Sequence, residues 1–317
     1  MGQETPAVAA KGFTGETSES RWHHLRRRWL GEETRWGYIF LAPVLAYLAV
    51  FVLFPVLYAF YLSFHEWNML SPTMKFVGTQ NYEALFKDPL FLQSLVNTAI
   101  FTFGVIGSII ILSLALALAL DTKLRSIGFF RGVYYTPAVT SVIVIAAVWS
   151  WMYEPNFGIL NNLAKMVGLP QLRWLSDMGT ALPSVIITAV WRNVGYFGVI
   201  FLAGLQGIDT MYYEAAKVDG ANAWSRFRHV TVPLLMPTTF YVIVMGIISS
   251  FQVFGLIYAM TGGGPVNATS VIVYYLYKQA FIYFKMGYAS ATAYVLFAII
   301  FTLTLIQFRF MGRRIEI

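Results

Sequence analysis

Long stretches without a charged side chain dominate this sequence. About 20 apolar residues cross the hydrocarbon core of a bilayer, so each stretch of that length predicts a transmembrane helix. Asp, Glu, Lys and Arg are absent from residues 36–65, 89–120, 132–153, 229–277 and 286–308. In a sixth stretch, residues 183–205, the only charged residue is Arg192. The window 229–277 predicts one span, because Thr261 to Pro265 reads Thr-Gly-Gly-Gly-Pro and breaks it. The predicted fold class is all-α: a polytopic membrane protein with six helices, at about 38–64, 95–120, 133–152, 183–205, 237–260 and 287–308.

The composition agrees with a membrane protein and excludes several kinds of chemistry. Hydrophobic residues make up 58% of the 317 residues and charged residues only 12%, whereas soluble domains carry roughly 25% charged residues. The absence of cysteine excludes disulfides and thiol catalysis, and we expect no metal site. The net charge of +7 could suggest nucleic-acid binding, but the positions of the charges indicate membrane orientation instead.

Lysine and arginine are unequally divided between the two sides of the six predicted spans. The N-terminal tail, the loops 121–132 and 206–235 and the C-terminal end hold fifteen of them, whereas the loops on the opposite side hold six. Positively charged residues are enriched in cytoplasmic segments. We therefore expect both termini, and the polar segment between the fourth and fifth spans, to be cytoplasmic.

The polar segment 209–237 is predicted to contain two short helices. Residues 212–218 form the first, Asp219-Gly220 is a turn signal that ends it, and residues 221–230 form the second. Acidic and basic residues balance within the segment, so it is not a simple basic patch for lipid. Small side chains would let a partner surface approach closely at Ala215, Ala216, Ala221 and Ala223.

This segment resembles the "EAA" loop of binding-protein-dependent ABC importer permeases, whose pattern is E-A-A-x-x-x-G with a later apolar-x-x-P. The matching residues are Glu214, Ala215, Ala216, Gly220, Val230 and Pro233. In that family the two short helices dock in a cleft of a separate ATPase. The resemblance therefore implies an ATPase-coupling role for Glu214, Ala215, Ala216, Asp219, Gly220, Ala221, Phe227 and Pro233. On spacing alone, the alternative is an ordinary helical hairpin that links two spans.

A glycine-rich loop narrows the resemblance within the family. Residues 261–269 read Thr-Gly-Gly-Gly-Pro-Val-Asn-Ala-Thr, and glycine permits the tight turns that other residues tolerate poorly. This loop resembles the sugar-permease branch, which includes the maltose-type and glycerol-3-phosphate-type permeases, and the resemblance covers about residues 36–312. It implies a loop that faces the extracytoplasmic binding protein, formed by Gly262, Gly263, Gly264 and Pro265.

Polar side chains inside the predicted spans indicate a substrate path, because such groups are costly in lipid and face the bundle interior or a wet cavity. In related sugar permeases the central cavity is lined from the equivalent helices, and a neutral sugar needs hydroxyl, amide and aromatic partners. The candidates are Arg192, Asn193, Tyr196, Ser249, Ser250 and Gln252. For the serines the alternative is helix packing. Arg192 could equally bind an anion or anchor a neighbouring helix.

The sequence has no means of using ATP by itself. It lacks any Gly-Lys dipeptide and therefore a P-loop, so ATP and Mg²⁺ are expected on partner ATPase subunits and no cofactor in this chain. The predicted spans also lack Asp and Glu, which argues against a secondary carrier that works on an ion gradient. We find no catalytic constellation and expect a translocation subunit rather than an enzyme.

Together these features predict a type I ABC importer permease in a bacterial inner membrane. The expected parts are a cytoplasmic tail (1–36), a six-helix transmembrane domain (37–312) that includes the coupling loop 209–237, and a cytoplasmic end (313–317). The expected solute is a sugar or oligosaccharide, with glycerol-3-phosphate or a glycerophosphodiester as the alternative. The resemblance implies a second homologous permease, two ATPase subunits, an extracytoplasmic solute-binding protein and membrane lipid as partners, and no nucleic acid.

Overall fold

A computed structural model describes residues 32–122 and 127–311. Most of the predicted N-terminal tail and all of the predicted C-terminal end lie outside these residues. The chain divides into two compact units, Met1–Tyr58 and Ala59–Ile317, and each is described by itself.

The first unit contains one long apolar helical stretch. It runs through α2 (Glu32–Leu48), the π-helical turn η1 (Ala49–Leu53) and the start of α3 (Phe54–Ser63). Its span Trp36–Ser63 is long and apolar enough to cross a membrane. The π-helical turn ends two residues before Pro55, which cannot donate to the regular helical hydrogen-bond pattern.

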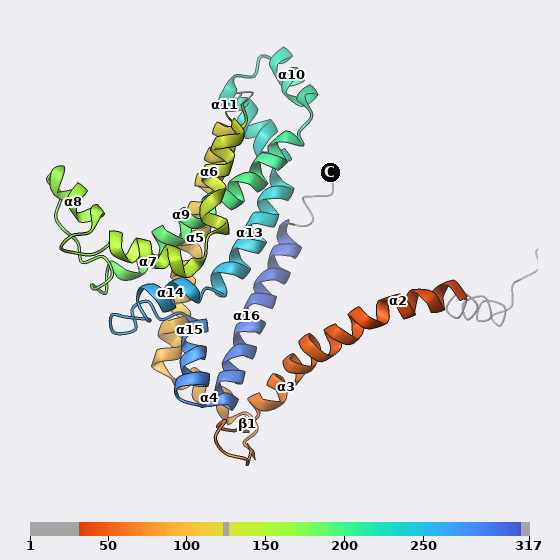
Figure 1. Cartoon of the computed structure of the whole chain (residues 1–317). Helices are drawn as coiled ribbons and strands as arrows, with labels where there is room; N and C mark the ends of the chain where they lie inside the picture. Colours follow the sequence, from red (N-terminus) through yellow and green to blue (C-terminus); the bar gives the residue numbers. More distant parts are fainter. Residues whose placement is uncertain (1–31, 123–126, 312–317) are drawn as a thin grey trace, which may run out of the picture. The chain divides into compact units, whose positions relative to one another are not determined.

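The second unit is organised around two long helices, α5 (Pro89–Leu120) and α9 (Ala181–Gln206), with α13 (Met236–Phe251) and α16 (Met286–Met311) beside them (Figure 1). The main core lies between α5, α9 and α13 and includes Phe101, Phe201 and Val242. The predicted start of the second span at residue 95 is wrong. α5 begins at Pro89, because the Asp88 side chain accepts a hydrogen bond from the Leu90 amide and caps the helix there.

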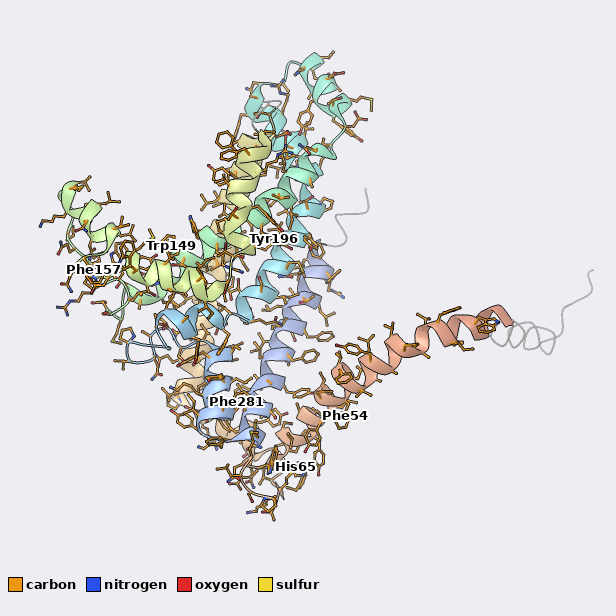
Figure 2. All side chains as sticks on the ribbon, viewed as in Figure 1. Phe54, His65, Trp149, Phe157, Tyr196 and Phe281 are labelled. Carbon is orange, nitrogen blue, oxygen red and sulfur yellow. The ribbon has the colours of Figure 1, made fainter. Side chains whose placement is uncertain are left out.

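The third predicted span is not one straight helix. It consists of α6 (Ile127–Val139) and α7 (Val142–Met152), which are bent by 96° at residues 140–141. Pro137 removes a backbone donor, and the hydroxyls of Thr136 and Thr140 bond to carbonyls one turn back, at Gly132 and Thr136. Beyond the break, Trp149 of α7, labelled in Figure 2, packs edge-on against Trp191 of α9, with ring centroids 5.4 Å apart.

Backbone contact joins α6 to α9 at a single glycine. A Cβ atom on Gly195 would lie 1.7 Å from the Tyr134 carbonyl oxygen, so no other residue fits there without separating the helices. At the preceding residue of α9, the Val194 carbonyl accepts a hydrogen bond from the Ser113 hydroxyl of α5 (3.0 Å). The three helices therefore meet closely at this level.

The fifth predicted span also differs from expectation. It starts within the polar segment, as α11 (Ala223–Arg226), the π-helical turn η2 (Phe227–Thr231) and α12 (Val232–Leu234), and bends by 62° into α13. The predicted continuation to residue 260 is wrong, because α13 ends at Phe251 and a separate helix, α14 (Gly255–Met260), packs against α7. The close approach at Gly255 explains the separation, since a Cβ there would lie 2.9 Å from Val142 Cγ1.

The described part of the chain thus holds four helices that are long and apolar enough to cross a membrane, or six spans if each bent pair counts as one. The remaining elements of the second unit are β1 (His65–Glu66), β2 (Lys75–Phe76), α4 (Gln80–Lys87), α8 (Ile159–Met166), α10 (Thr210–Val218), α15 (Ile272–Tyr277) and η3 (Lys278–Ile282). Figure 1 shows α10 and α11 at one end of the bundle and β1 and α4 at the other. This arrangement agrees with the predicted opposite sides for the polar segment and the first outer loop.

Candidate functional site: the exposed helix pair and the central cavity

The turn between α10 and α11 is a regular helix-ending motif. Gly220 has a left-handed backbone (φ +77°), its amide donates to the Lys217 carbonyl, and the Ala221 amide donates to the Ala216 carbonyl. These two bonds define a Schellman motif with glycine at its left-handed position. The predicted first helix is present as α10, and Asp209 caps its start by accepting a hydrogen bond from Met211 N (2.9 Å).

Four large apolar side chains of this helix pair are exposed on the protein surface. Their exposed fractions are 62% for Met211, 50% for Tyr212, 88% for Val218 and 67% for Trp224. Glu214, Ala215, Asp219, Gly220 and Pro233 are exposed too, and Ala216, Ala221 and Phe227 are half-buried. An exposed apolar cluster among polar residues is typical of a protein–protein contact.

The helix pair is nevertheless held to the end of the fifth span. The Tyr213 hydroxyl of α10 hydrogen-bonds the Thr231 hydroxyl of η2 (3.0 Å), and Thr231 is buried. Asn222 caps α11 by accepting from Ser225 N (2.8 Å). The turn and this hydroxyl pair therefore connect α10 to the segment that leads into α13.

A cavity of about 260 Å³ lies between α5, α7, α9, α13 and α14. Four of the six predicted substrate-path residues line it: Arg192 and Asn193 from α9, and Ser249 and Ser250 from α13. Asn193 and Ser249 also bond to backbone carbonyls of their own helices, at Ala189 (2.8 Å) and Gly246 (3.1 Å). The cavity that they line has about the size of one small solute.

Arg192 connects this cavity to the break in the third span. Its Nη2 donates to the Ala138 carbonyl at the end of α6 (3.4 Å), and its Nη1 donates to Asn193 Oδ1 (3.4 Å). Its Nε is buried and has no hydrogen-bond partner among the described residues. Both bonds are long, so the guanidinium is incompletely satisfied.

Two predicted substrate-path residues lie elsewhere. Tyr196 packs with the main core next to Phe197, with ring centroids 5.0 Å apart. Gln252 is exposed and is the residue that follows the end of α13. Neither lines the cavity.

The glycine-rich loop is mostly packed inward. Gly262 and Gly263 have left-handed backbones (φ +54° and +79°), and a Cβ on Gly263 would lie 2.6 Å from the Tyr274 ring. Thr269, fully buried, donates to the Gly264 carbonyl (2.7 Å). Val266 is 74% exposed and Gly262 is also exposed, whereas Gly264 and Pro265 are half-buried and Gly263 is buried.

Hydrogen bonds from α5 also hold this loop in place. Asn97 Nδ2 donates to the Asn267 and Ser270 carbonyls (both 3.0 Å). The Ser94 and Ser270 hydroxyls also bond to each other (3.2 Å). Sequence reasoning recognised the loop but did not identify these partners on α5.

A carboxylate and two phenols hold the start of α5 to α15 and α16. Asp88 Oδ2 accepts hydrogen bonds from Tyr275 (2.5 Å) and Tyr288 (3.2 Å). Burial raises the pKa of Asp88, but these bonds and the one from the Leu90 amide outweigh burial and bring the pKa below its usual 3.8. Sequence reasoning missed this cluster; its only readable signal was the Asp88-Pro89 helix start.

Comparison with known proteins identifies a matching family. The family described as "Binding-protein-dependent transport system inner membrane component" matches residues 109–317. A probable ABC transporter permease protein, YurN, of Bacillus subtilis is 40% identical over 277 residues, which cover 86% of this chain and 94% of that protein. The lactose transport system permease protein LacF of Rhizobium radiobacter is 34% identical over 278 residues, covering 86% and 92%.

A solved structure has the same fold. It is the crystal structure of a bacterial ABC transporter involved in the import of the acidic polysaccharide alginate, with a TM-score of 0.75 and 22% sequence identity. The match covers 94% of this chain and 99% of that chain. This likeness concerns the fold alone.

Proposed function

This chain belongs to the family of binding-protein-dependent transport system inner membrane components, and we propose that it is the permease subunit of an ATP-driven importer that carries a sugar or oligosaccharide. The observation that carries the proposal is the exposed helix pair α10–α11. It lies within the matched residues 109–317 and presents apolar side chains, including Val218 and Trp224, at the end of the bundle.

The helix pair explains how a chain without a P-loop uses ATP. The complex has two ATPase subunits, which carry ATP and Mg²⁺, and one of them binds the coupling residues from Glu214 to Pro233. A second homologous permease completes the pathway. Closure of the ATPases moves α10 and α11. The Tyr213–Thr231 contact passes that movement to α13, and the central cavity opens to the outside.

The sugar assignment rests on the cavity and on one relative. Its lining offers the hydroxyls of Ser249 and Ser250 and the amide of Asn193, which are suitable partners for sugar hydroxyls. LacF, a relative 34% identical, is named as a lactose permease. An extracytoplasmic binding protein delivers the solute to the side of the glycine-rich loop, residues Gly262 to Pro265.

The orientation follows from the charge distribution. Fifteen lysines and arginines lie in the tail, in the inner loops and at the end, against six in the outer loops. Both termini are therefore cytoplasmic, in a multi-pass protein of the bacterial inner membrane. In this orientation the α10–α11 end faces the cytoplasm, where ATPases operate.

Import of a phosphorylated solute is the second candidate, and one observation favours it. The buried Nε of Arg192 has no partner among the described residues, and a guanidinium pairs well with phosphate. Glycerol-3-phosphate or a glycerophosphodiester would supply that anion. Arg192 already contacts Asn193 and Ala138, so we rank this candidate below a neutral sugar.

The first test is purification of the tagged chain from its native membrane in mild detergents, with identification of every co-purifying protein. We expect a P-loop ATPase and a second permease. The complex, reconstituted in liposomes with its binding protein, should then take up lactose, maltose or glycerol-3-phosphate only with ATP. Recovery of this chain alone across several detergents, together with uptake driven by an ion gradient, would instead support a secondary carrier.

A further inference from the structure

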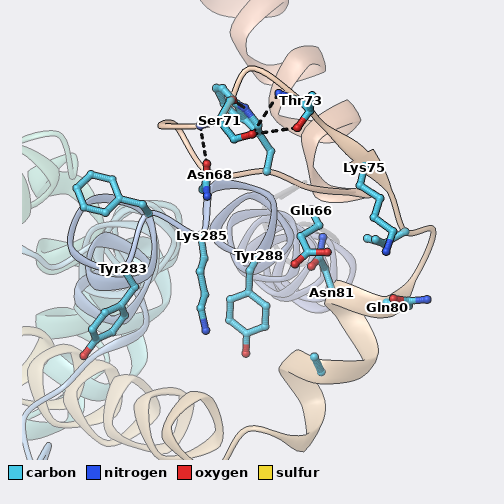
Figure 3. Close-up of a pocket in the computed structure, with 14 residues that line it drawn as sticks. Glu66, Asn68, Ser71, Thr73, Lys75, Gln80, Asn81, Tyr283, Lys285 and Tyr288 are labelled. Atoms are coloured by element: carbon cyan, nitrogen blue, oxygen red, sulfur yellow. Dashed lines mark hydrogen bonds between the residues drawn. The ribbon is translucent and has the colours of Figure 1, made fainter.

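A second cavity, of about 680 Å³, opens at the end of the bundle that lies opposite α10 and α11. Its walls come from the β1–β2 hairpin, the start of α4, and the segment 283–288 that leads into α16 (Figure 3). It shares no lining residue with the central cavity. Its volume lies within the range of about 300–1,000 Å³ that is usual for small-molecule sites.

The walls of this outer pocket are held rigidly together. The Met286 amide donates to the Trp67 carbonyl (3.0 Å), and a Cβ on Gly287 would lie 1.7 Å from the His65 carbonyl oxygen. Asn81 Nδ2 donates to the carbonyls of Ser63 (2.9 Å) and His65 (3.0 Å). The Met286–Trp67 bond links segments more than 200 residues apart, and the Asn81 bonds hold α4 to the hairpin, so the pocket is largely formed before any ligand arrives.

Backbone strain is located on the wall of the pocket. Phe284 has φ +57°, a left-handed conformation that is unfavourable for a bulky residue. This turn places Tyr283, Phe284 and Lys285 along the same wall. Strain of this kind persists only where the surroundings enforce it, and it is concentrated at ligand sites.

Three charged side chains line the pocket. Glu66 and Lys75 are cross-strand neighbours in the hairpin, and Lys285 enters from the opposite wall. Within residues 32–122 and 127–311, no ion pair joins the three. A carboxylate that accepts and two ammonium groups that donate therefore remain available to one molecule.

We propose that this outer pocket binds a saccharide unit on the extracytoplasmic face of the permease. Glu66, Lys75 and Lys285 supply hydrogen bonds to hydroxyls, and Tyr283 and Phe284 supply flat apolar faces for a sugar ring. The mixed charge excludes a lipid chain. The choice of a saccharide rests on the proposed function, since it takes the solute class from there.

The test measures sugar binding to the full chain in lipid nanodiscs without binding protein. Saturation-transfer NMR and calorimetry would use maltose, lactose and galacturonate as probes. We expect weak binding of at least one probe, and a loss of affinity of about fivefold or more in the double variant Glu66→Gln/Lys285→Met, because each substitution removes a charged hydrogen-bond partner. The matched control is Lys87→Met, an exposed lysine of α4 outside the pocket, and it should bind like the unmodified chain.

Three outcomes would overturn the inference: no binding of any probe, equal binding by the double variant, or a double variant that keeps sugar binding but loses stimulation of the complex by its binding protein. The last would identify the pocket as a protein-docking surface. ATP-dependent uptake by the assembled complex is measured in parallel. Intact uptake without sugar binding in the outer pocket refutes only this inference, whereas absent uptake refutes the proposed function.

Discussion

The turn at Gly220 and the outer loop at Gly263 both depend on glycine, but they differ in their surroundings. At the α10–α11 turn, no described atom lies within 4 Å of a Cβ built on Gly220, although the backbone there is left-handed (φ +77°). At the outer loop, Gly263 has nearly the same φ (+79°), but a Cβ would lie 2.6 Å from the Tyr274 ring. One turn is open to a partner, and the other is closed on its own protein.

This difference separates two uses of the same residue type. Gly220 is needed only because the backbone there is left-handed. Its neighbours present exposed apolar side chains such as Val218. Gly263 is needed because its backbone is left-handed and because a side chain there would overlap Tyr274. Hydrogen bonds from Thr269 and from Asn97 of α5 hold its loop in place. Substitutions in the outer loop should therefore damage the fold, whereas those in the α10–α11 turn should damage only coupling.

The largest effect is expected for Gly263→Val. The β-branched side chain combines left-handed strain with overlap on Tyr274, and together these cost about 3 kcal/mol or more. The variant should unfold at a clearly lower temperature in detergent and lose ATP-dependent uptake. An unchanged unfolding temperature would show that the outer loop is not locked as described.

Gly220→Val should abolish most uptake while the spans remain folded. The added side chain meets no atom, but left-handed strain of about 1–2 kcal/mol opens the turn and misdirects α10. Uptake and ATPase stimulation should fall about tenfold with an unchanged unfolding temperature. The matched control is Gly168→Val, which has a similar φ (+75°) and is equally open, and which should transport normally. Normal transport by Gly220→Val would disprove the coupling assignment.

Asn97→Ala should have a smaller effect on the fold. It removes the side-chain donor of the Ser270 carbonyl and one of two donors of the Asn267 carbonyl, which keeps the Ser270 amide (3.1 Å), at a cost of about 1–3 kcal/mol. Thermal unfolding in detergent measures this. Asn162→Ala, which removes one exposed bond of 3.3 Å to Phe157, serves as the control and should shift the unfolding temperature much less. Equal shifts would mean that α5 does not hold the loop.

Glu214→Gln should have the smallest effect on stability, within about 0.5 kcal/mol, because the side chain is exposed. Loss of its charge should weaken binding of the ATPase and lower uptake by less than tenfold. Titration of the ATPase against the permease pair measures the affinity. Asp121→Asn, another exposed carboxylate outside the coupling segment, should leave that affinity unchanged.

Hydropathy and charge predicted the number and order of the spans, but not their bends. Charge-free windows report only that a segment prefers lipid, and a bent pair satisfies them as well as a straight helix does. Pro137 was visible in the sequence, yet the third span breaks at residues 140–141. There the Ala138 carbonyl accepts from Arg192, 54 residues away, a contact that no local pattern contains.

The cavity shows the same limit for individual residues. Arg192 and Tyr196 were expected to share a face at i, i+4, but the lining follows Ala189, Asn193 and Phe197, with Arg192 beside that stripe. Tyr196 therefore turns to the core. Gln252 was assigned to the fifth span and lies just beyond its end, because α13 stops at Phe251. Helical spacing shows which residues share a face of a helix, but it does not show which face lines the cavity.

The contact at Gly195 has a consequence for how the protein moves. The backbones of α6 and α9 touch at Tyr134 and Gly195, and no side chain lies between them to act as a flexible spacer. We therefore expect α6 and α9 to keep their mutual distance when the protein changes conformation. Beyond the bend at residues 140–141, Trp149 of α7 also packs against Trp191 of α9, so we expect α7 to move with these two helices.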